Sequence, residues 1–311
     1  MYFFEREQYI YNIAGVRIGG VRGETPTVLV GTIFYSGDKV VADHKKGLFD
    51  RDAARRQIEE QDRVSEVTGN PAMVQVFAES SAAMVRYIDF VSDATSSPFL
   101  IDSTDAQVRL DGLRHCQETG LLDRAVYNSI NASVTDEEIR GLEETRPQSA
   151  IILAFNPHDS TIAGRRAVLE QPVSGRDKGL LELARELGVT KPLVDTATTA
   201  IGAGAGTSIS FIMVAKTLYG QPTGSGVHNA PTSWPWLRAY KKTDRDAYEA
   251  CDTASPLLVQ AMGGDFVLYG PISNARRVFP VVAMADVFAA ESASMEFGLT
   301  PEENHPFRKL L

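Results

Sequence analysis

Five polar side chains follow short apolar runs in separate parts of the chain, and their chemistry is that of a binding site. They are Asp102, Asn128, Asn156, Asp195 and Asn229. Carboxylates accept hydrogen bonds and amides both donate and accept them, so together they suit a flat heterocycle with N–H and C=O groups on its edges, such as a pterin. One such aspartate alone is better explained as the cap of the following helix. The combination of five favours a binding site.

The sequence around these side chains follows one pattern, in which short apolar runs alternate with longer amphipathic segments. This alternation is typical of βα units and a parallel sheet. The amphipathic segments, such as RDAARRQIEEQDRVSEV, repeat apolar residues about every three or four positions, as helices do. We predict eight strands, at residues 27–33, 72–78, 98–102, 124–129, 150–156, 191–195, 222–229 and 265–272.

Eight strands with eight crossings predict an α/β protein with a closed (β/α)8 TIM barrel, as one domain over residues 1–311. An open, doubly wound sheet is the alternative. Two segments fall outside the pattern: residues 1–25 predict a short β-hairpin under the barrel, and residues 230–262 form an insertion between the seventh and eighth strands. Because the C-terminal ends of several strands supply the site in such barrels, the five polar residues are expected to meet there.

Composition and charge limit the class of protein. With 43% hydrophobic and 23% charged residues, the chain is predicted to be soluble and globular. A formal net charge of −9 argues against a nucleic-acid partner. Two widely separated cysteines and the charged start MYFFEREQ predict a cytoplasmic protein. We expect no membrane insertion, because the most apolar stretch, residues 278–290, is short and carries Asp286.

Several common catalytic chemistries lack support in the sequence. The five histidines show no ligand spacing with each other or with the cysteines, so we expect no metal site. No lysine stands at the C-terminal end of a predicted strand, which weakens a Schiff-base mechanism. There is no GxSxG elbow of the kind that serine hydrolases use.

Three further motifs have both a structural and a ligand-binding interpretation. The glycine-rich GAGAGTS, residues 202–208, lacks the lysine of a phosphate-binding loop. We favour close backbone packing there, with contact to a large ligand as the alternative. The lysines of residues 39–46 indicate a solvated loop, or a docking surface for an anionic tail or a partner protein. The aromatic residues of the stretch 234–240 predict a packed lid, with a stacking platform for a flat ring as the alternative.

Nearly the whole chain resembles one family. The motifs that carry the resemblance are IAGVRIGG, ETPTVLVGTIFYSGDKVV, KKGLFD, YIDFV, PFLIDST, RAVYNSIN, AFNP, GAGAG and GSGVHNAP. They resemble the H subunit of tetrahydromethanopterin S-methyltransferase and its soluble bacterial relatives, the methylcorrinoid:tetrahydrofolate methyltransferases of glycine-betaine demethylation. More distantly, the chain is similar to methyltetrahydrofolate:corrinoid methyltransferases and dihydropteroate synthases, which are pterin-binding TIM barrels.

The resemblance implies a role for each of the five polar residues. Asp102 in LIDST, Asn128 in YNS and Asp195 in LVDT match the family positions that bind the pterin edge. Asn229 in GVHNAP matches the asparagine beside pterin N5 in the distant relatives, and it is the implied catalytic residue. Asn156 in AFNP matches another amide at the barrel mouth.

The implied reaction moves a methyl group between the cobalt of a corrinoid (cobalamin) and N5 of tetrahydrofolate, giving 5-methyltetrahydrofolate in one-carbon metabolism. The corrinoid would be carried by a partner protein, no cofactor would be tightly bound, and the enzyme would be a homodimer. A tetrahydromethanopterin-dependent subunit of a larger complex is one alternative, and a non-catalytic docking subunit for a corrinoid protein is another. Dihydropteroate synthase is less well supported. It must bind a pyrophosphate, which needs a lysine and an arginine at the ends of the last strands, and Arg276 and Arg277 supply these only in part.

Overall fold

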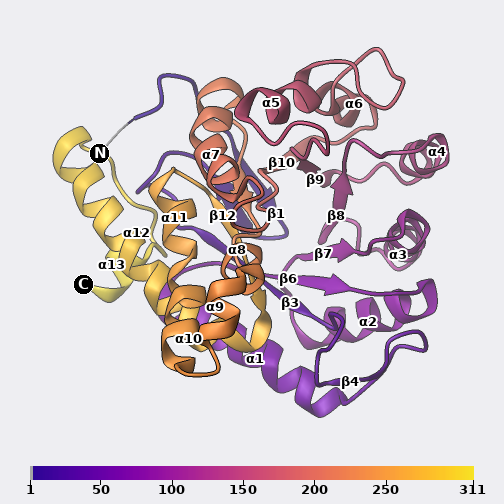
Figure 1. Ribbon diagram of the computed structural model, residues 1–311, viewed down its shortest axis with the longest axis horizontal. Helices are drawn as coiled ribbons and strands as arrows, with labels where there is room; N and C mark the ends of the chain where they lie inside the picture. Colours follow the sequence, from indigo (N-terminus) through magenta and orange to yellow (C-terminus); the bar gives the residue numbers. More distant parts are fainter. Residues whose placement is uncertain (1–2) are drawn as a thin grey trace.

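A closed parallel barrel forms the centre of the molecule (Figure 1). The computed structural model describes residues 3–311. Within them, eight strands close in the order β10, β11, β12, β3, β6, β7, β8, β9. The predicted barrel is confirmed, and the alternative of an open sheet is wrong. The barrel strands are β3 (Val28–Ile33), β6 (Ala72–Phe77), β7 (Phe99–Asp102), β8 (Ala125–Ile130), β9 (Ser149–Leu153), β10 (Lys191–Asp195), β11 (Thr223–Ser225) and β12 (Phe266–Pro271).

Helices cover the outside of the barrel, and Figure 1 shows α2, α3 and α4 around the strands that precede them. Side-chain caps set where several of them begin. The carboxylate of Asp50 accepts the backbone N–H of Ala53 at the start of α1, and Asp105 accepts that of Gln107 at the start of α3. These helices are α1 (Arg51–Thr68), α2 (Ser81–Ala94), α3 (Ala106–Glu118), α4 (Asp136–Thr145), α5 (Ile162–Glu170), α6 (Leu180–Glu186), α7 (Ala205–Tyr219), α12 (Ala275–Phe297) and α13 (Pro306–Leu310).

The apolar interior of the barrel determines which strand residues point inward. Side chains from seven of the eight strands form one buried cluster. Successive residues of a strand point to opposite faces, so the residue two positions later also points inward, one layer nearer the C-terminal end. The inward-facing strand residues of this cluster are Val28, Val30, Met73, Leu100, Val126, Ile151, Leu193, Phe266 and Leu268.

A hairpin of β1 (Ile10–Ile13) and β2 (Val16–Gly19) packs on the end of the barrel where the strands begin. Its residues Ile13 and Ile18 are fully buried in the interior cluster. The backbone N–H of Tyr9 donates to the carbonyl of Gly220, just before β11, at 2.8 Å. The hairpin therefore covers the end opposite to the predicted site.

Helix α12 is the longest helix and packs along the barrel. With the short 3-10 turn η1 (Ile272–Asn274) before it, α12 is the one helix among residues 3–311 whose length and composition would allow it to cross a membrane. Its buried side carries Val278 and Phe279 in a cluster with strand residues of β3 and β12. On the same side, Asp286 accepts hydrogen bonds from Thr27, at 2.9 Å from its backbone N and 2.8 Å from its Oγ1.

The chain leaves the sheet earlier than predicted at two strands. The predicted strand at 222–229 is wrong beyond Ser225, because a turn from Gly226 leads directly into a helix at Asn229. The predicted strand at 150–156 ends at Leu153, where the N–H of Phe155 turns back to the Leu153 carbonyl. Between β11 and β12 lie α8 (Asn229–Ser233), α9 (Pro235–Tyr240), α10 (Arg245–Ala254) and α11 (Pro256–Ala261).

Candidate functional site

Three of the five predicted residues meet at the C-terminal end of the barrel interior. In each of β7, β8 and β10, the residue two positions before the polar one is an inward-facing apolar residue of the interior cluster. The two-residue period therefore turns Asp102, Asn128 and Asp195 inward as well. They line one pocket of about 480 Å³ at the mouth of the barrel.

Several polar lining residues of this pocket were not predicted. The amide Nε2 of Gln75 donates to Oδ2 of Asp102 at 2.5 Å, and the hydroxyl of Thr32 donates to Oε1 of Gln75 at 2.8 Å. Both follow an inward-facing apolar residue by two positions, so the strand period was the signal that could have found them. These two hydrogen bonds hold Oδ2 of Asp102 in place at the pocket wall.

Asp195 and Asn128 keep polar atoms available to a ligand. Oδ1 of Asp195 accepts the backbone N–H of Ala197 at 2.6 Å. Oδ2 of Asp195 and the side-chain amide of Asn128 have no hydrogen-bond partner within residues 3–311. None of these atoms is among the buried unpartnered atoms of residues 3–311, so solvent reaches them in the pocket, and a ligand with matching N–H and C=O groups would bind them.

Burial also perturbs the acidity of both carboxyl groups. It raises the pKa of Asp102 to about 6, against the opposing effects of the Gln75 hydrogen bond and the positive charge of Arg109. Burial likewise raises the pKa of Asp195 to about 6, against the hydrogen bond from the Ala197 N–H. Both carboxylates are ionised near neutral pH and would bind N–H donors most strongly in that form.

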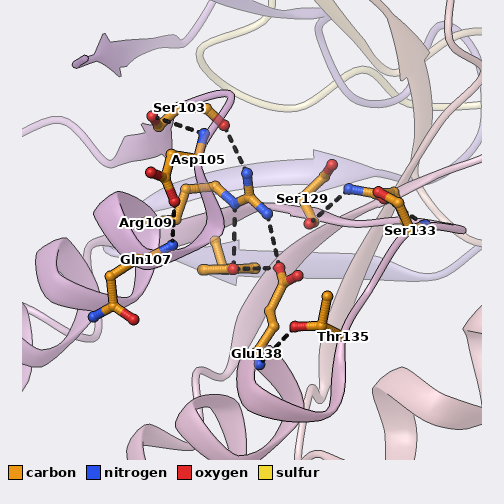
Figure 2. Close-up of polar contacts among 10 residues, drawn as sticks. Ser103, Asp105, Gln107, Arg109, Ser129, Ser133, Thr135 and Glu138 are labelled. Carbon is orange, nitrogen blue, oxygen red and sulfur yellow. Dashed lines mark hydrogen bonds and ion pairs between the residues drawn. The ribbon is translucent and has the colours of Figure 1, made fainter. Parts of the chain in front are cut away.

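A buried network behind β7 and β8 supports the site residues. Figure 2 shows the guanidinium of Arg109, on α3, between the Ser103 carbonyl and the carboxylate of Glu138, on α4. The Arg109 Nη1 lies 2.6 Å from the Ser103 carbonyl oxygen, and Nη2 lies 2.8 Å from Glu138 Oε1. The hydroxyl of Tyr127 donates to the same Glu138 oxygen at 2.5 Å. The network thus ties together the residues that adjoin Asp102 and Asn128 in the chain.

Replacing Tyr127 by Phe is expected to lower the free energy of unfolding by about 1 to 2 kcal/mol, because a buried hydrogen bond to a charged pair is lost. Urea denaturation of the purified variant measures this. Tyr219→Phe is the matched control, because the Tyr219 hydroxyl donates to Glu170 at the exposed surface. If both variants lost the same free energy of unfolding, the buried network would not contribute more than a surface hydrogen bond.

Of the two remaining predicted residues, one lines the pocket and the other does not. Asn229 begins α8 and lines the pocket, with its Nδ2 at 3.4 Å from the Thr198 carbonyl. Asn156 does not line it. Its Oδ1 accepts the backbone N–H groups of His158 and Asp159, and its Nδ2 donates to Gly164. Because β9 ends at Leu153, Asn156 lies in the loop and the strand period does not turn it inward.

Other features of the sequence lie away from this pocket. Among residues 3–311, no group of three or more His, Cys, Asp or Glu side chains could hold a metal ion. Arg276 pairs with Glu60 at 2.9 Å and Arg277 pairs with Glu249, and neither arginine lines the pocket. These basic side chains are therefore not placed to bind a pyrophosphate beside Asp102.

The glycine-rich segment borders a second, apolar pocket of about 580 Å³, next to the first. Trp234 also lines it, and its ring packs 4.8 Å from that of Trp236. A Cβ atom added at Gly202 or Gly206 would meet no atom within 4 Å. Close packing therefore explains Gly204, whose added Cβ would lie 3.0 Å from Ser160, but not the other two glycines.

Comparisons with known proteins agree with this architecture. The profile of the family described as "Tetrahydromethanopterin S-methyltransferase MtrH subunit" matches residues 6–301. The chain is 48% identical to the H subunit of tetrahydromethanopterin S-methyltransferase from Methanothermobacter thermautotrophicus over 311 residues, covering 100% of both chains. It is 46% identical to the H subunit of the putative methyltransferase mtx from Methanosarcina mazei over 311 residues, again with 100% of both chains covered.

Solved structures of low sequence identity share the fold. A Yersinia pestis dihydropteroate synthase with a pterine-sulfa conjugate superposes with a TM-score of 0.60, at 9% identity, over 90% of this chain and 99% of that one. A dihydropteroate synthase from Xanthomonas albilineans in complex with 7,8-dihydropteroate gives a TM-score of 0.57 at 12% identity, over 91% and 99% of the two chains.

Proposed function

This chain belongs to the family of the tetrahydromethanopterin S-methyltransferase MtrH subunit, and from that premise we propose that it transfers a methyl group between N5 of a tetrahydropterin and the cobalt of a corrinoid. The corrinoid is a substrate that a partner protein carries. Relatives at 42% to 48% identity that are named for tetrahydromethanopterin support this pterin better than the tetrahydrofolate expected from sequence. The pterin we propose is therefore of the tetrahydromethanopterin type.

The observation that carries the proposal is the convergence of Asp102, Asn128 and Asp195 on one pocket. The 2-amino-pyrimidinone ring of a pterin presents N–H donors and a carbonyl along one edge. Two ionised carboxylates accept from such donors, and the Asn128 amide can both donate and accept. These three residues would fix the pterin plane and aim its second ring at the mouth, where the methyl group is exchanged.

Asn229 lies at that mouth and is proposed to contact N5. Nitrogen is a poor leaving group unless it gains positive character, and in the reverse direction N5 must be unprotonated to take the methyl group. A neutral amide can hydrogen-bond N5 in both states without fixing a charge there, which suits a reversible transfer. The other task of the protein is to hold N5 in line with the incoming cobalt.

We propose that the protein works in a larger assembly with its corrinoid-carrying partner, in the cytoplasm, and that it forms a homodimer. The exposed side of α12 supports self-association. It presents Met284, Phe288 and Met295 with 50%, 65% and 79% of their surfaces exposed. Large apolar side chains in a row on one helix face are typical of a covered surface. Sedimentation of the Phe288→Glu variant against the unchanged protein tests the dimer.

Pterin binding is expected to weaken below neutral pH. The bound form needs both carboxylates ionised, and each has a pKa of about 6 in the folded protein. Each is nearly fully ionised at pH 7.5 and half protonated at pH 6, so the dissociation constant should rise about fourfold between these values. Between pH 6 and pH 5.5 it should rise about another fourfold, because each carboxylate contributes about twofold. Isothermal titration from pH 7.5 to 5.5 measures this, and a flat profile would contradict the carboxylate contacts.

The proposed activity is tested by anaerobic spectrophotometry with methylcobalamin as methyl donor. Tetrahydromethanopterin and tetrahydrofolate are offered separately, and loss of the methyl–cobalt absorbance is followed. We expect turnover with tetrahydromethanopterin and little or none with tetrahydrofolate. The reversed preference would reinstate the folate reaction. Pterin binding without transfer, even with the cognate corrinoid protein, would favour a docking role.

A further inference from the structure

His228 is a titratable residue of the pocket that the transfer described above does not use. It follows β11 by three residues, precedes Asn229 and lines the same pocket. Its Nδ1 lies 3.2 Å from the backbone carbonyl oxygen of Leu268. A carbonyl oxygen only accepts hydrogen bonds, so Nδ1 carries the proton of the neutral ring. The lone pair is therefore on Nε2.

The orientation of this ring is fixed by its neighbours. Gly270, on β12, has φ +85, and a Cβ atom added there would lie 2.8 Å from Cδ2 of His228. The glycine thus lets the imidazole pack directly on the β12 backbone. The hydroxyl of Thr232 donates to the His228 carbonyl at 2.6 Å and holds the start of α8. Within residues 3–311 Nε2 has no hydrogen-bond partner, and it is not a buried atom, so it faces the pocket.

The barrel order places His228 across the pocket from Asp102 and Asn128, and beside the strand that carries Asp195. Asp102, Asn128 and Asp195 come from β7, β8 and β10, which with β9 form one arc of the barrel. His228 and Asn229 follow β11, and the His228 ring packs on β12. In the closed order β11 lies four strands from β7 and β12 lies four strands from β8, so the ring faces Asp102 and Asn128 from the other side. A two-ring heterocycle whose pyrimidine edge is held by the arc of β7 to β10 extends its second ring, which contains N5, toward that other side.

Few other groups in the pocket could exchange a proton with N5. The ionisable lining residues besides His228 are Asp102, Asp195 and Tyr35. The two carboxylates are committed to the pyrimidine edge, and burial raises the pKa of the Tyr35 phenol, so it keeps its proton. The groups of β12 that contact the imidazole, the Leu268 carbonyl and Gly270, are uncharged. Burial lowers the pKa of His228 and the Leu268 carbonyl partly offsets this.

We propose that His228 is the proton donor and acceptor for pterin N5, an inference that rests on the proposed methyl transfer. When N5 gives up its methyl group, the N–C bond breaks and its electron pair remains on nitrogen. The electron pair of the cobalt(I) corrinoid forms the new Co–C bond. N5 takes a proton from Nε2 of the imidazolium, which regains one from solvent. In the reverse reaction the N5 proton returns to Nε2 as the methyl group arrives.

The test compares His228→Gln with the unchanged protein, using 5-methyltetrahydromethanopterin and cob(I)alamin. Glutamine keeps a polar group near Nε2 but cannot carry a proton at neutral pH. We expect the rate to fall about a hundredfold at pH 7, with the pterin dissociation constant within about threefold. Demethylation by the unchanged protein should slow as pH rises through the His228 pKa. The pH–rate profile of the variant should lose this decrease at high pH and keep the decrease at low pH that comes from protonation of the carboxylates.

His115→Gln is the matched control, because His115 pairs with Asp89 at 2.6 Å on the outside of the barrel. Its rate should stay within about twofold of the unchanged protein. Nitrogen-15 NMR of labelled histidines adds a readout independent of turnover, with His228 assigned by its absence from the glutamine variant. We expect a protonated Nδ1 and an unprotonated Nε2.

The outcomes separate this inference from the function beneath it. A His228→Gln protein with unchanged rate and pH profile would overturn the proton role and leave the methyl transfer intact. The opposite tautomer in the NMR spectrum would also overturn it. If the unchanged protein neither binds pterin nor transfers methyl groups, the proposed function fails, and the inference fails with it.

Discussion

Replacing Asp195 by Asn is expected to weaken tetrahydropterin binding by about a hundredfold. The exchange keeps the shape of the side chain but removes the charge of a carboxylate whose residue is only 7% exposed. A hydrogen bond to such a buried charged group contributes about 1.5 to 3 kcal/mol, and the new NH2 group would face the N–H donors of the ligand. Isothermal titration at pH 7.5 measures the change, where the Asp195 carboxylate of the unchanged protein is ionised.

Asp105→Asn is the matched control for this loss. Asp105 lies in the loop after β7 and caps α3, where its Oδ1 accepts the Gln107 N–H at 2.8 Å. Asparagine caps a helix about as well as aspartate, so binding and thermal stability should be unchanged. Equal affinity of the Asp195→Asn variant and the unchanged protein would remove Asp195 from the pterin site.

Replacing Asn229 by Ala is expected to slow methyl transfer by about a hundredfold, while pterin affinity stays within about threefold. The amide is proposed to support N5 most strongly in the transition state, when charge develops on the nitrogen, and removing one such donor typically costs this much. Alanine is also compatible with the first turn of α8, and Asn229 is an exposed residue, so folding should be preserved.

The two directions of transfer provide an internal check on the Asn229→Ala variant. An enzyme cannot change the equilibrium between its free substrates, so the kcat/KM values of the two directions must fall by the same factor. Stopped-flow absorbance of the corrinoid follows each direction under single-turnover conditions. Unchanged turnover would rule out a catalytic role for Asn229. A loss of pterin affinity as large as the loss of rate would make it a binding residue instead.

Most of the barrel could be predicted from the pattern of apolar residues. Strand β10 was predicted with the bounds that it has, Lys191–Asp195, because an uninterrupted apolar run ends in an aspartate before a polar loop. The predicted strand at 222–229 was wrong beyond Ser225, because β11 pairs through only two residues on each side. A strand that short leaves no periodic signal, and the turn at Gly226 depends on contacts that no local pattern encodes.

The site could be predicted only in part. Asp102 and Asp195 end their strands, and Asn128 lies two residues before the end of β8. All three are in phase with inward-facing apolar residues, so their convergence follows from the two-residue period once a barrel is assumed. Asn156 lies beyond the end of β9, and its amide makes hydrogen bonds within the loop before α5. Membership of the family was also a property of the motifs alone, and the comparisons confirm it.

The sequence by itself determined the alternation of strands and helices, the family and the residue types at the strand ends. Only the tertiary structure decided which polar atoms are paired and which face the pocket. Gln75 reaches Asp102 across 27 positions of the chain, and the His228 ring reaches the Leu268 carbonyl across 40. Such contacts depend on how neighbouring strands are staggered when the barrel closes. A shift of one residue would turn each side chain to the opposite face of its strand.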